Sequence, residues 1–217
     1  MPIRVGLKTI KLWNESLEQQ VCNYESEKRE KGQIVFYGPS YFTRWKASYG
    51  ETPMEEMIVG KSGTPCVINR GFGSSCSEHQ LYYYPRMVRP LEPSVLVYEC
   101  FGNGTYHGYS YEEIWELAQR VIAYARVDFP DIHIYLLSPL PELKDTPEDI
   151  RKKMEFGLML QQYTEVTPNC YYIDALHNAD FKRKDIFIAD GVHLNKLGYQ
   201  FFAKMFRNAL AKELERF

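Results

Sequence analysis

Short apolar runs alternate with longer amphipathic stretches along almost the whole chain. The short runs are rich in Val, Ile and Tyr with little polar alternation, which is typical of strands buried on both faces of a parallel sheet. Apolar residues recur at intervals of three and four in the stretches between them, which predicts helices. The pattern predicts an α/β fold with helices on both faces of a five-stranded parallel sheet, a three-layer α/β/α sandwich. Its strands are expected at residues 33–38, 65–69, 94–98, 132–137 and 171–174.

Capping residues mark where several helices begin. Ser110 and Glu113 form the pattern of a capping box, in which each side chain accepts a backbone N–H of the other residue. Thr146 followed by Pro147 predicts another helix start, because proline fits the first helical position. Asn195 is expected to cap the last helix. The predicted helices therefore begin where the alternation of strands and helices requires them.

No feature of the sequence divides the chain into parts. It contains no internal repeat, low-complexity tract or linker-like change in composition. An amphipathic helix is expected at residues 9–29, where four apolar residues recur at helical spacing: Trp13, Leu17, Val21 and Tyr24. Residues 1–217 are therefore expected to form one domain, with that N-terminal helix followed by a core at 33–217.

Composition narrows the function classes. A chain of 217 residues with 45% apolar and 25% charged residues is typical of a globular α/β domain. The formal net charge of −2 argues against a nucleic-acid partner, which usually requires a basic excess. The five cysteines are widely spaced without a CxxC pair, which favours free thiols in a reducing compartment. Without a signal-peptide pattern or a membrane-length apolar run, a cytoplasmic protein with no membrane partner is expected.

Polar residues follow the ends of four predicted strands. They are Ser40 after the first strand, Gly73 and Ser74 after the second, Asn103 after the third, and Asp190 and His193 after the fifth. The carboxyl ends of parallel strands meet at one edge of a sheet, where ligands bind. Each residue alone has a simpler interpretation: a serine cap, a tight glycine turn, a left-handed asparagine or a chance Asp-x-x-His. The hypothesis of a site depends on all of them meeting at the same edge.

These residue types together suit acyl transfer. A serine hydroxyl such as Ser40 needs a base to take its proton, and His193 is suited to that role. Asp190, three residues before His193, is placed to hold the imidazole in the right tautomer. The Asn103 amide and the backbone N–H groups of Ser40 and Ser74 are expected to form an oxyanion hole. The chain has no GxSxG motif, so it does not follow the common α/β-hydrolase layout.

Four segments of the chain resemble the sequence blocks of the SGNH (GDSL-type) hydrolases. They are Tyr37-Gly-Pro-Ser40, Asn69-Arg-Gly-Phe-Gly-Ser-Ser75, Phe101-Gly-Asn-Gly104 and Asp190-Gly-Val-His193-Leu-Asn. The resemblance covers residues 33–200 and implies a flavodoxin-like topology. It also implies Ser40 as nucleophile and first oxyanion donor, Asn103 as side-chain donor, His193 as base and Asp190 as its partner.

The chain departs from that family's pattern at several positions. Pro39 stands where the family has an aspartate before the serine. Ser74 stands where a glycine donates its amide, and Gly104 stands where an aspartate follows the asparagine. Phe101 replaces a further glycine. None of these changes removes a catalytic group, and together they indicate a divergent branch with an altered cleft.

The predicted function is a serine esterase that removes a small acyl group, with acetyl expected, from a carbohydrate or other polar alcohol. Gly73, Arg70 and Tyr106 are expected to contact this small-molecule substrate. No cofactor is expected, and no metal, because the remaining histidines show no ligand spacing. A non-catalytic binder on the same fold is the alternative. A nucleotide or phosphate binder is disfavoured by the absence of a P-loop or GxGxxG motif. The oligomeric state stays open.

Overall fold

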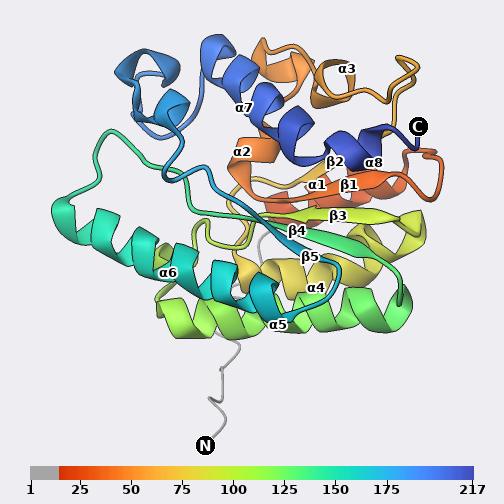
Figure 1. Cartoon of the computed structure of the whole chain (residues 1–217), viewed down its shortest axis with the longest axis horizontal. Helices are drawn as coiled ribbons and strands as arrows, with labels where there is room; N and C mark the ends of the chain where they lie inside the picture. Colours follow the sequence, from red (N-terminus) through yellow and green to blue (C-terminus); the bar gives the residue numbers. More distant parts are fainter. Residues whose placement is uncertain (1–14) are drawn as a thin grey trace, which may run out of the picture.

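A five-stranded, all-parallel sheet forms the centre of the molecule (Figure 1). The structure, a computed structural model, describes residues 15–217. The sheet order is β2-β1-β3-β4-β5, the flavodoxin-like order, so the predicted fold class is confirmed. The strands are β1 (Ile34–Gly38), β2 (Val67–Gly71), β3 (Val95–Tyr98), β4 (His133–Leu137) and β5 (Cys170–Ile173).

Helices cover both faces of this sheet, as the apolar patterns predict (Figure 1). One face packs against α1 (Glu15–Glu25), α4 (Ser77–Met87), α5 (Tyr111–Asp128) and α6 (Pro147–Val166). The other face packs against α2 (Ser40–Thr43), α3 (Met54–Met57), α7 (Lys196–Ala209) and α8 (Ala211–Leu214). Short 3-10 helices complete the loops: η2 (Ala47–Tyr49), η3 (Arg89–Leu91), η4 (Thr105–His107), η5 (Ala179–Lys182) and η6 (Lys184–Ile186).

The predicted caps are present. The Ser110 side chain accepts the Glu113 N–H at 3.2 Å, and the Ser110 N–H donates back to the glutamate at 2.8 Å. Thr146 forms an equivalent pair with Asp149 at the start of α6. The Asn195 side chain accepts two backbone N–H groups at the start of α7. Because caps are local, sequence spacing alone predicts them well.

Every strand differs from its expected range by one or two residues at one or both ends, and the N-terminal helix differs by more. The N-terminal helix is confirmed over Glu15–Glu25 but ends there rather than at residue 29, and the part of the expected range 9–29 before residue 15 lies outside the described residues. Strand β2 ends at Gly71 rather than at Asn69, because Arg70 continues the strand. Arg70 is buried there and forms an ion pair with Glu27 at 2.8 Å, so its charge does not end the strand.

Two further features of the described residues concern membrane-spanning helices and cysteines. Among residues 15–217, no helix has both the length and the apolar character that a membrane span needs. All five cysteines are free thiols: Cys22 is exposed, whereas Cys66, Cys76, Cys100 and Cys170 are buried.

Candidate active site

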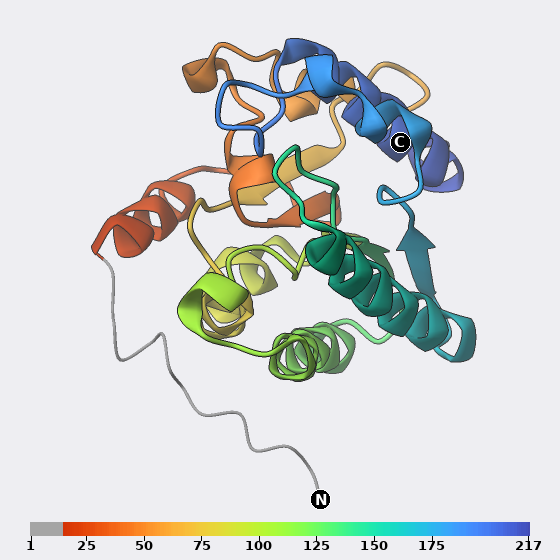
Figure 2. The ribbon, with the colours of Figure 1, turned by 90° about the vertical axis from the view of Figure 1, so that its left-hand side faces the viewer.

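The carboxyl ends of the strands open on one edge of the sheet, which Figure 2 faces. Ser40 lies there as the first residue of α2, two positions after the end of β1. Gly38 permits this sharp passage, because a Cβ on it would lie 2.9 Å from the Glu99 Cβ and 2.9 Å from the Phe42 ring. The loops that precede α6 and α7 meet over α2 (Figure 2), and the Leu143 N–H donates to the Gly191 carbonyl at 2.9 Å.

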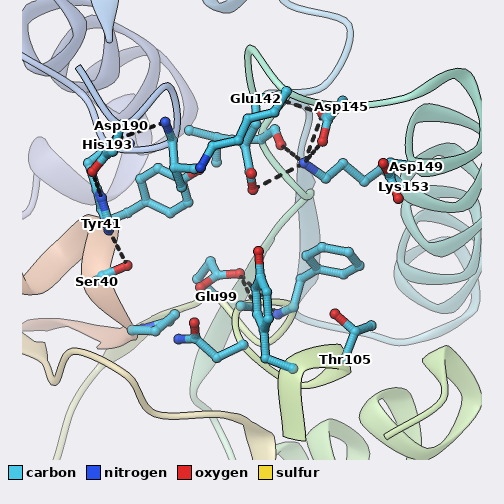
Figure 3. A pocket seen from close by; sticks show the side chains of 18 of the residues that line it. Ser40, Tyr41, Glu99, Thr105, Glu142, Asp145, Asp149, Lys153, Asp190 and His193 are labelled. Atoms are coloured by element: carbon cyan, nitrogen blue, oxygen red, sulfur yellow. Dashed lines mark hydrogen bonds and ion pairs between the residues drawn. The ribbon is translucent and has the colours of Figure 1, made fainter. Parts of the chain in front are cut away.

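Ser40, His193 and Asp190 lie in one hydrogen-bonded line (Figure 3). The Ser40 Oγ is 3.0 Å from the His193 Nε2, and the His193 Nδ1 is 2.6 Å from the Asp190 Oδ2. The second carboxylate oxygen, Asp190 Oδ1, accepts the backbone N–H groups of Val192 and His193, each at 2.9 Å. The Asp-x-x-His spacing therefore forms a closed local turn, which fixes the imidazole relative to the carboxylate.

Asp190 stays ionised in this setting. Burial opposes its ionisation, but the hydrogen bonds from the His193 side chain and from the two backbone N–H groups outweigh burial, and the pKa falls to about 2. An ionised Asp190 accepts a hydrogen bond from Nδ1–H, so in the neutral imidazole the lone pair of Nε2 faces the Ser40 hydroxyl. This is the arrangement in which a histidine takes a proton from a serine.

The loop around His193 is held from several sides. Its carbonyl accepts the Ile188 N–H at 2.9 Å, and the Gly191 N–H donates to the Ile188 carbonyl at 3.0 Å. Gly191 has φ +71, a left-handed conformation that suits glycine. The Tyr41 ring lies 6.1 Å from the imidazole, centre to centre. The histidine is thus positioned by a turn and by α2 together.

Of the residues predicted to form the oxyanion hole with Ser40, Asn103 lies beside it and Ser74 does not. Asn103 lines the same cavity as Ser40, and its side-chain amide donates one N–H to the Ser75 carbonyl at 2.9 Å. An amide has two N–H donors, and the second has no partner among residues 15–217. Ser74 is exposed, does not line that cavity and has φ +67, a left-handed conformation that costs a non-glycine residue about 1–2 kcal/mol.

Two residues expected to contact substrate lie elsewhere. Arg70 is in β2, with its guanidinium against the Tyr24 ring and paired with Glu27. The Gly73 N–H donates to the Gln20 side chain at 2.9 Å, so it is directed to α1. Neither lines the cavity beside Ser40, which corrects the prediction. The physical reason is that β2 is longer than expected, so its polar side chains serve the α1 interface. Tyr106 does line the cavity and is 85% exposed.

The cavity beside Ser40 has a volume of about 460 Å³ and a strongly polar wall (Figure 3). Five carboxyl groups and two ammonium groups line it: Glu99, Glu142, Asp145, Asp149, Asp190, Lys144 and Lys153. Lys153 is buried and reaches Asp145 at 2.8 Å, Glu142 at 3.2 Å and the Leu140 carbonyl at 2.9 Å. It lies across the cavity from the Ser40–His193 pair (Figure 3).

Sequence reasoning missed this charged wall. Lys153 resembles an ordinary exposed helix lysine, but it lies three and seven residues before Phe156 and Leu160, which are fully buried in α6. That spacing is a signal that Lys153 faces inward. Glu99 directly follows β3, a position from which a side chain enters the carboxyl edge of the sheet.

Glu99 is a buried carboxyl group next to the reactive centre. Its Oε1 accepts the backbone N–H groups of Phe101 at 3.0 Å and Gly102 at 3.1 Å, whereas its Oε2 has no partner among the described residues. Burial raises the pKa from its ordinary value of 4.5 to about 7, although the two N–H groups oppose the rise. Below neutral pH the group is therefore a neutral hydrogen-bond donor.

We expect Glu99→Gln to flatten the pH dependence of stability. Between pH 4.5 and 7 the folded state retains a proton on Glu99 that the unfolded state has lost. The free energy of unfolding of the wild type therefore falls as pH rises through this window, by up to about 3 kcal/mol from this group. Glutamine stays neutral and keeps an acceptor for both N–H groups. Urea unfolding at pH 5, 6, 7 and 8 measures the difference, and equal slopes for both proteins would contradict the prediction.

The comparisons with known proteins show similarity of fold. No protein-family model matches the chain, and no curated protein matches it in sequence. A GDSL-like lipase from Bacteroides thetaiotaomicron matches with a TM-score of 0.71, over 91% of this chain and 98% of the lipase, at 15% identity. An acetyl xylan esterase matches with a TM-score of 0.67, over 82% of this chain and 99% of the esterase, at 21% identity.

A third structure agrees with these two. A family 3 carbohydrate esterase from Clostridium thermocellum matches with a TM-score of 0.60, over 86% of this chain and 98% of the esterase, at 15% identity. The matches cover nearly the whole of each solved chain, so they compare complete folds rather than a shared fragment. The chain therefore has the α/β fold of the SGNH (GDSL-type) hydrolases, as the resemblance of its four sequence blocks predicts.

Proposed function

We propose that the protein is a serine ester hydrolase that works through an acyl-enzyme on Ser40. The observation that carries this proposal is the line from Ser40 through His193 to Asp190, with separations of 3.0 and 2.6 Å, beside a cavity of about 460 Å³. The three residues come from two segments about 150 positions apart, which only the fold brings together. Both ring nitrogens of His193 have a partner, Ser40 on one side and Asp190 on the other, which a chance contact between two exposed side chains does not explain.

The proposed reaction follows from this geometry. His193 Nε2 takes the Ser40 proton as Oγ forms a bond to the ester carbonyl carbon. The carbonyl oxygen becomes negative, and the second N–H of Asn103 and the backbone N–H of Ser40 are the proposed donors, whereas Ser74, predicted as a third, does not line the cavity. The imidazolium, stabilised by Asp190, then protonates the leaving alcohol. Water attacks the acyl-enzyme with His193 again as base, which releases the acid and restores the serine.

The cavity favours a polar alcohol as the leaving group. Its carboxyl groups outnumber its ammonium groups, so it repels carboxylates and phosphates. The same oxygens accept hydrogen bonds from hydroxyl groups, and Tyr106 offers an exposed ring at the rim. Two solved structures with this fold are an acetyl xylan esterase and a carbohydrate esterase, which supports an acetylated carbohydrate as the substrate. The reaction requires no cofactor.

Covalent labelling tests the proposal. A fluorophosphonate reacts with an activated serine, and peptide mapping by mass spectrometry is expected to find the adduct on Ser40 alone. Turnover of p-nitrophenyl esters from acetyl to octanoyl is expected to be fastest for acetyl, by at least about tenfold over octanoyl. Folded protein that takes up no label, or takes it up on another residue, would overturn the proposal.

A non-catalytic binder is the second candidate, and the second loop favours it. Ser74 occupies a left-handed conformation with φ +67, where the resembled family has glycine. The departures from the family pattern at Pro39 and Gly104 fit the packing around them. A Cβ on Gly102 would lie 2.6 Å from Pro39 Cγ, and one on Gly104 would lie 2.5 Å from Ile114. A binder would retain acetylated oligosaccharides without converting them, and it would take up no fluorophosphonate.

A further inference from the structure

A cysteine and two histidines meet between the loops that follow β2 and β3. A ligand atom of each of Cys76, His79 and His107 lies within 4.8 Å of the others. Cys76 caps α4 and His79 lies in its first turn, whereas His107 ends η4. Because β3 separates the two segments along the chain, sequence spacing alone predicts no metal there.

The separations within this cluster suit a metal ion. The Cys76 Sγ is 3.5 Å from the His79 Nδ1. A Zn²⁺ ion with bonds of about 2.3 Å to sulfur and about 2.0 Å to nitrogen, at a tetrahedral angle, separates two such ligands by about 3.5 Å. One thiolate and two imidazoles form a donor set that Zn²⁺ and Co²⁺ accept, with a fourth position left for water.

The polar contacts of His79 are incomplete without a further partner. The residue is 4% exposed, and its Nε2 has no hydrogen-bond partner among residues 15–217. Its Nδ1 accepts a long bond, 3.2 Å, from the Cys76 backbone N–H. An ion bonded to Nδ1, the nitrogen beside the Cys76 thiol, would replace this long hydrogen bond with a stronger bond. His107 is only half-buried, and its ring centre lies 5.6 Å from that of His79, which gives an ion access from solvent.

We propose that Cys76, His79 and His107 bind one zinc ion that joins the second and third loops. These loops carry Ser74 and Asn103, and a hydrogen bond from the Asn103 amide to the Ser75 carbonyl already links them. A metal bonded to Cys76 and His107 adds a second link next to the first. This site is separate from the Ser40 line, so its existence does not depend on the proposed hydrolase activity.

Cobalt titration tests the site without using activity. Protein freed of metal with a chelator and returned to chelator-free buffer is titrated with Co²⁺. The expected result is one equivalent bound, with the visible bands of tetrahedral cobalt and a near-ultraviolet thiolate-to-cobalt band. Zn²⁺ is expected to displace the cobalt and to raise the melting temperature. His107→Ala, a change at a half-buried loop position, is expected to weaken Zn²⁺ binding by at least about tenfold.

Two matched controls locate the thiolate and the imidazole. Cys76→Ser is expected to abolish the thiolate band, whereas Cys22→Ser, at an exposed thiol of α1, is expected to keep it. His177→Ala, at an exposed histidine, is expected to leave Zn²⁺ affinity unchanged. No thiolate band in the wild type, a band that survives Cys76→Ser, or equal Zn²⁺ affinity in His107→Ala would each overturn the proposal.

Discussion

Replacing Ser40 by alanine is expected to lower kcat/KM toward a small acetyl ester by about 10⁶-fold. The Ser40 Oγ makes its side-chain hydrogen bond with the His193 Nε2, so its removal takes away the proposed nucleophile and unpairs only that nitrogen, on a ring that is partly exposed. The free energy of unfolding is therefore expected to stay within about 1 kcal/mol of the wild type. Steady-state hydrolysis and urea unfolding of the same preparations measure both effects.

His193→Ala is expected to lower kcat/KM by about as much as Ser40→Ala. The double variant is expected to lose no more than either single variant, because the two groups act in one step. Asp190→Asn is expected to lower kcat/KM by about 10⁴-fold, because an amide supports the wrong tautomer of the imidazole. The chain supplies a matched control. His177 and Asp174 form the same local pair, with Nδ1 2.9 Å from Oδ2, at an exposed position.

His177→Ala is expected to leave kcat/KM unchanged, because its imidazole has no serine partner among the described residues. Equal losses in His177→Ala and His193→Ala would mean that the assay reports folding rather than chemistry. Activity retained in Ser40→Ala would place the nucleophile elsewhere and remove the basis of the hydrolase proposal.

The two Asp-x-x-His segments show how far sequence alone reaches. Each forms its local hydrogen bond, because the spacing itself brings the carboxylate to the imidazole. The strand-end rule does not show which of them meets a serine, because Asp174 directly follows β5. The resemblance of the block at 190–195 to the SGNH hydrolases is what points to His193. The capping residues and the strand pattern were predictable for the same reason: their physics is local.

The residues whose positions the sequence did not predict are of another kind. Arg70, Lys153 and Glu99 are all charged residues that the fold buries. Arg70 is paired with a distant residue, Glu27. Lys153 is paired with Asp145 in the loop before its own helix, and Glu99 accepts N–H groups from the two residues that follow Cys100. Charged residues are seldom buried, so they were expected in solvent or near substrate, although the helical spacing of Lys153 and the place of Glu99 after β3 carry a signal. The full character of the cavity wall therefore emerges only with the fold.

The second large effect concerns Gly71, the last residue of β2, which packs against the helix that carries Ser40. A Cβ on Gly71 would lie 2.5 Å from the Phe42 carbonyl carbon and 2.6 Å from the Phe42 Cβ, where the backbone of α2 passes. The Asn69 side chain adds to this close contact, since its amide donates to the Phe42 carbonyl at 2.8 Å. Because the obstacle is mainly backbone, a change of side-chain rotamer does not relieve it.

Gly71→Ala is therefore expected to lower the free energy of unfolding by about 3 kcal/mol or more. Any folded fraction must shift α2, and a displacement of about 1 Å between Ser40 and His193 is expected to reduce kcat/KM by about 100-fold. Gly73→Ala is the matched control two residues on, since a Cβ there meets only the Thr43 side chain, at 3.7 Å. Urea unfolding and ester hydrolysis of both variants test the pair. Equal stability for Gly71→Ala and Gly73→Ala would show that α2 does not need this close contact, and the account of how the fold positions Ser40 would be wrong.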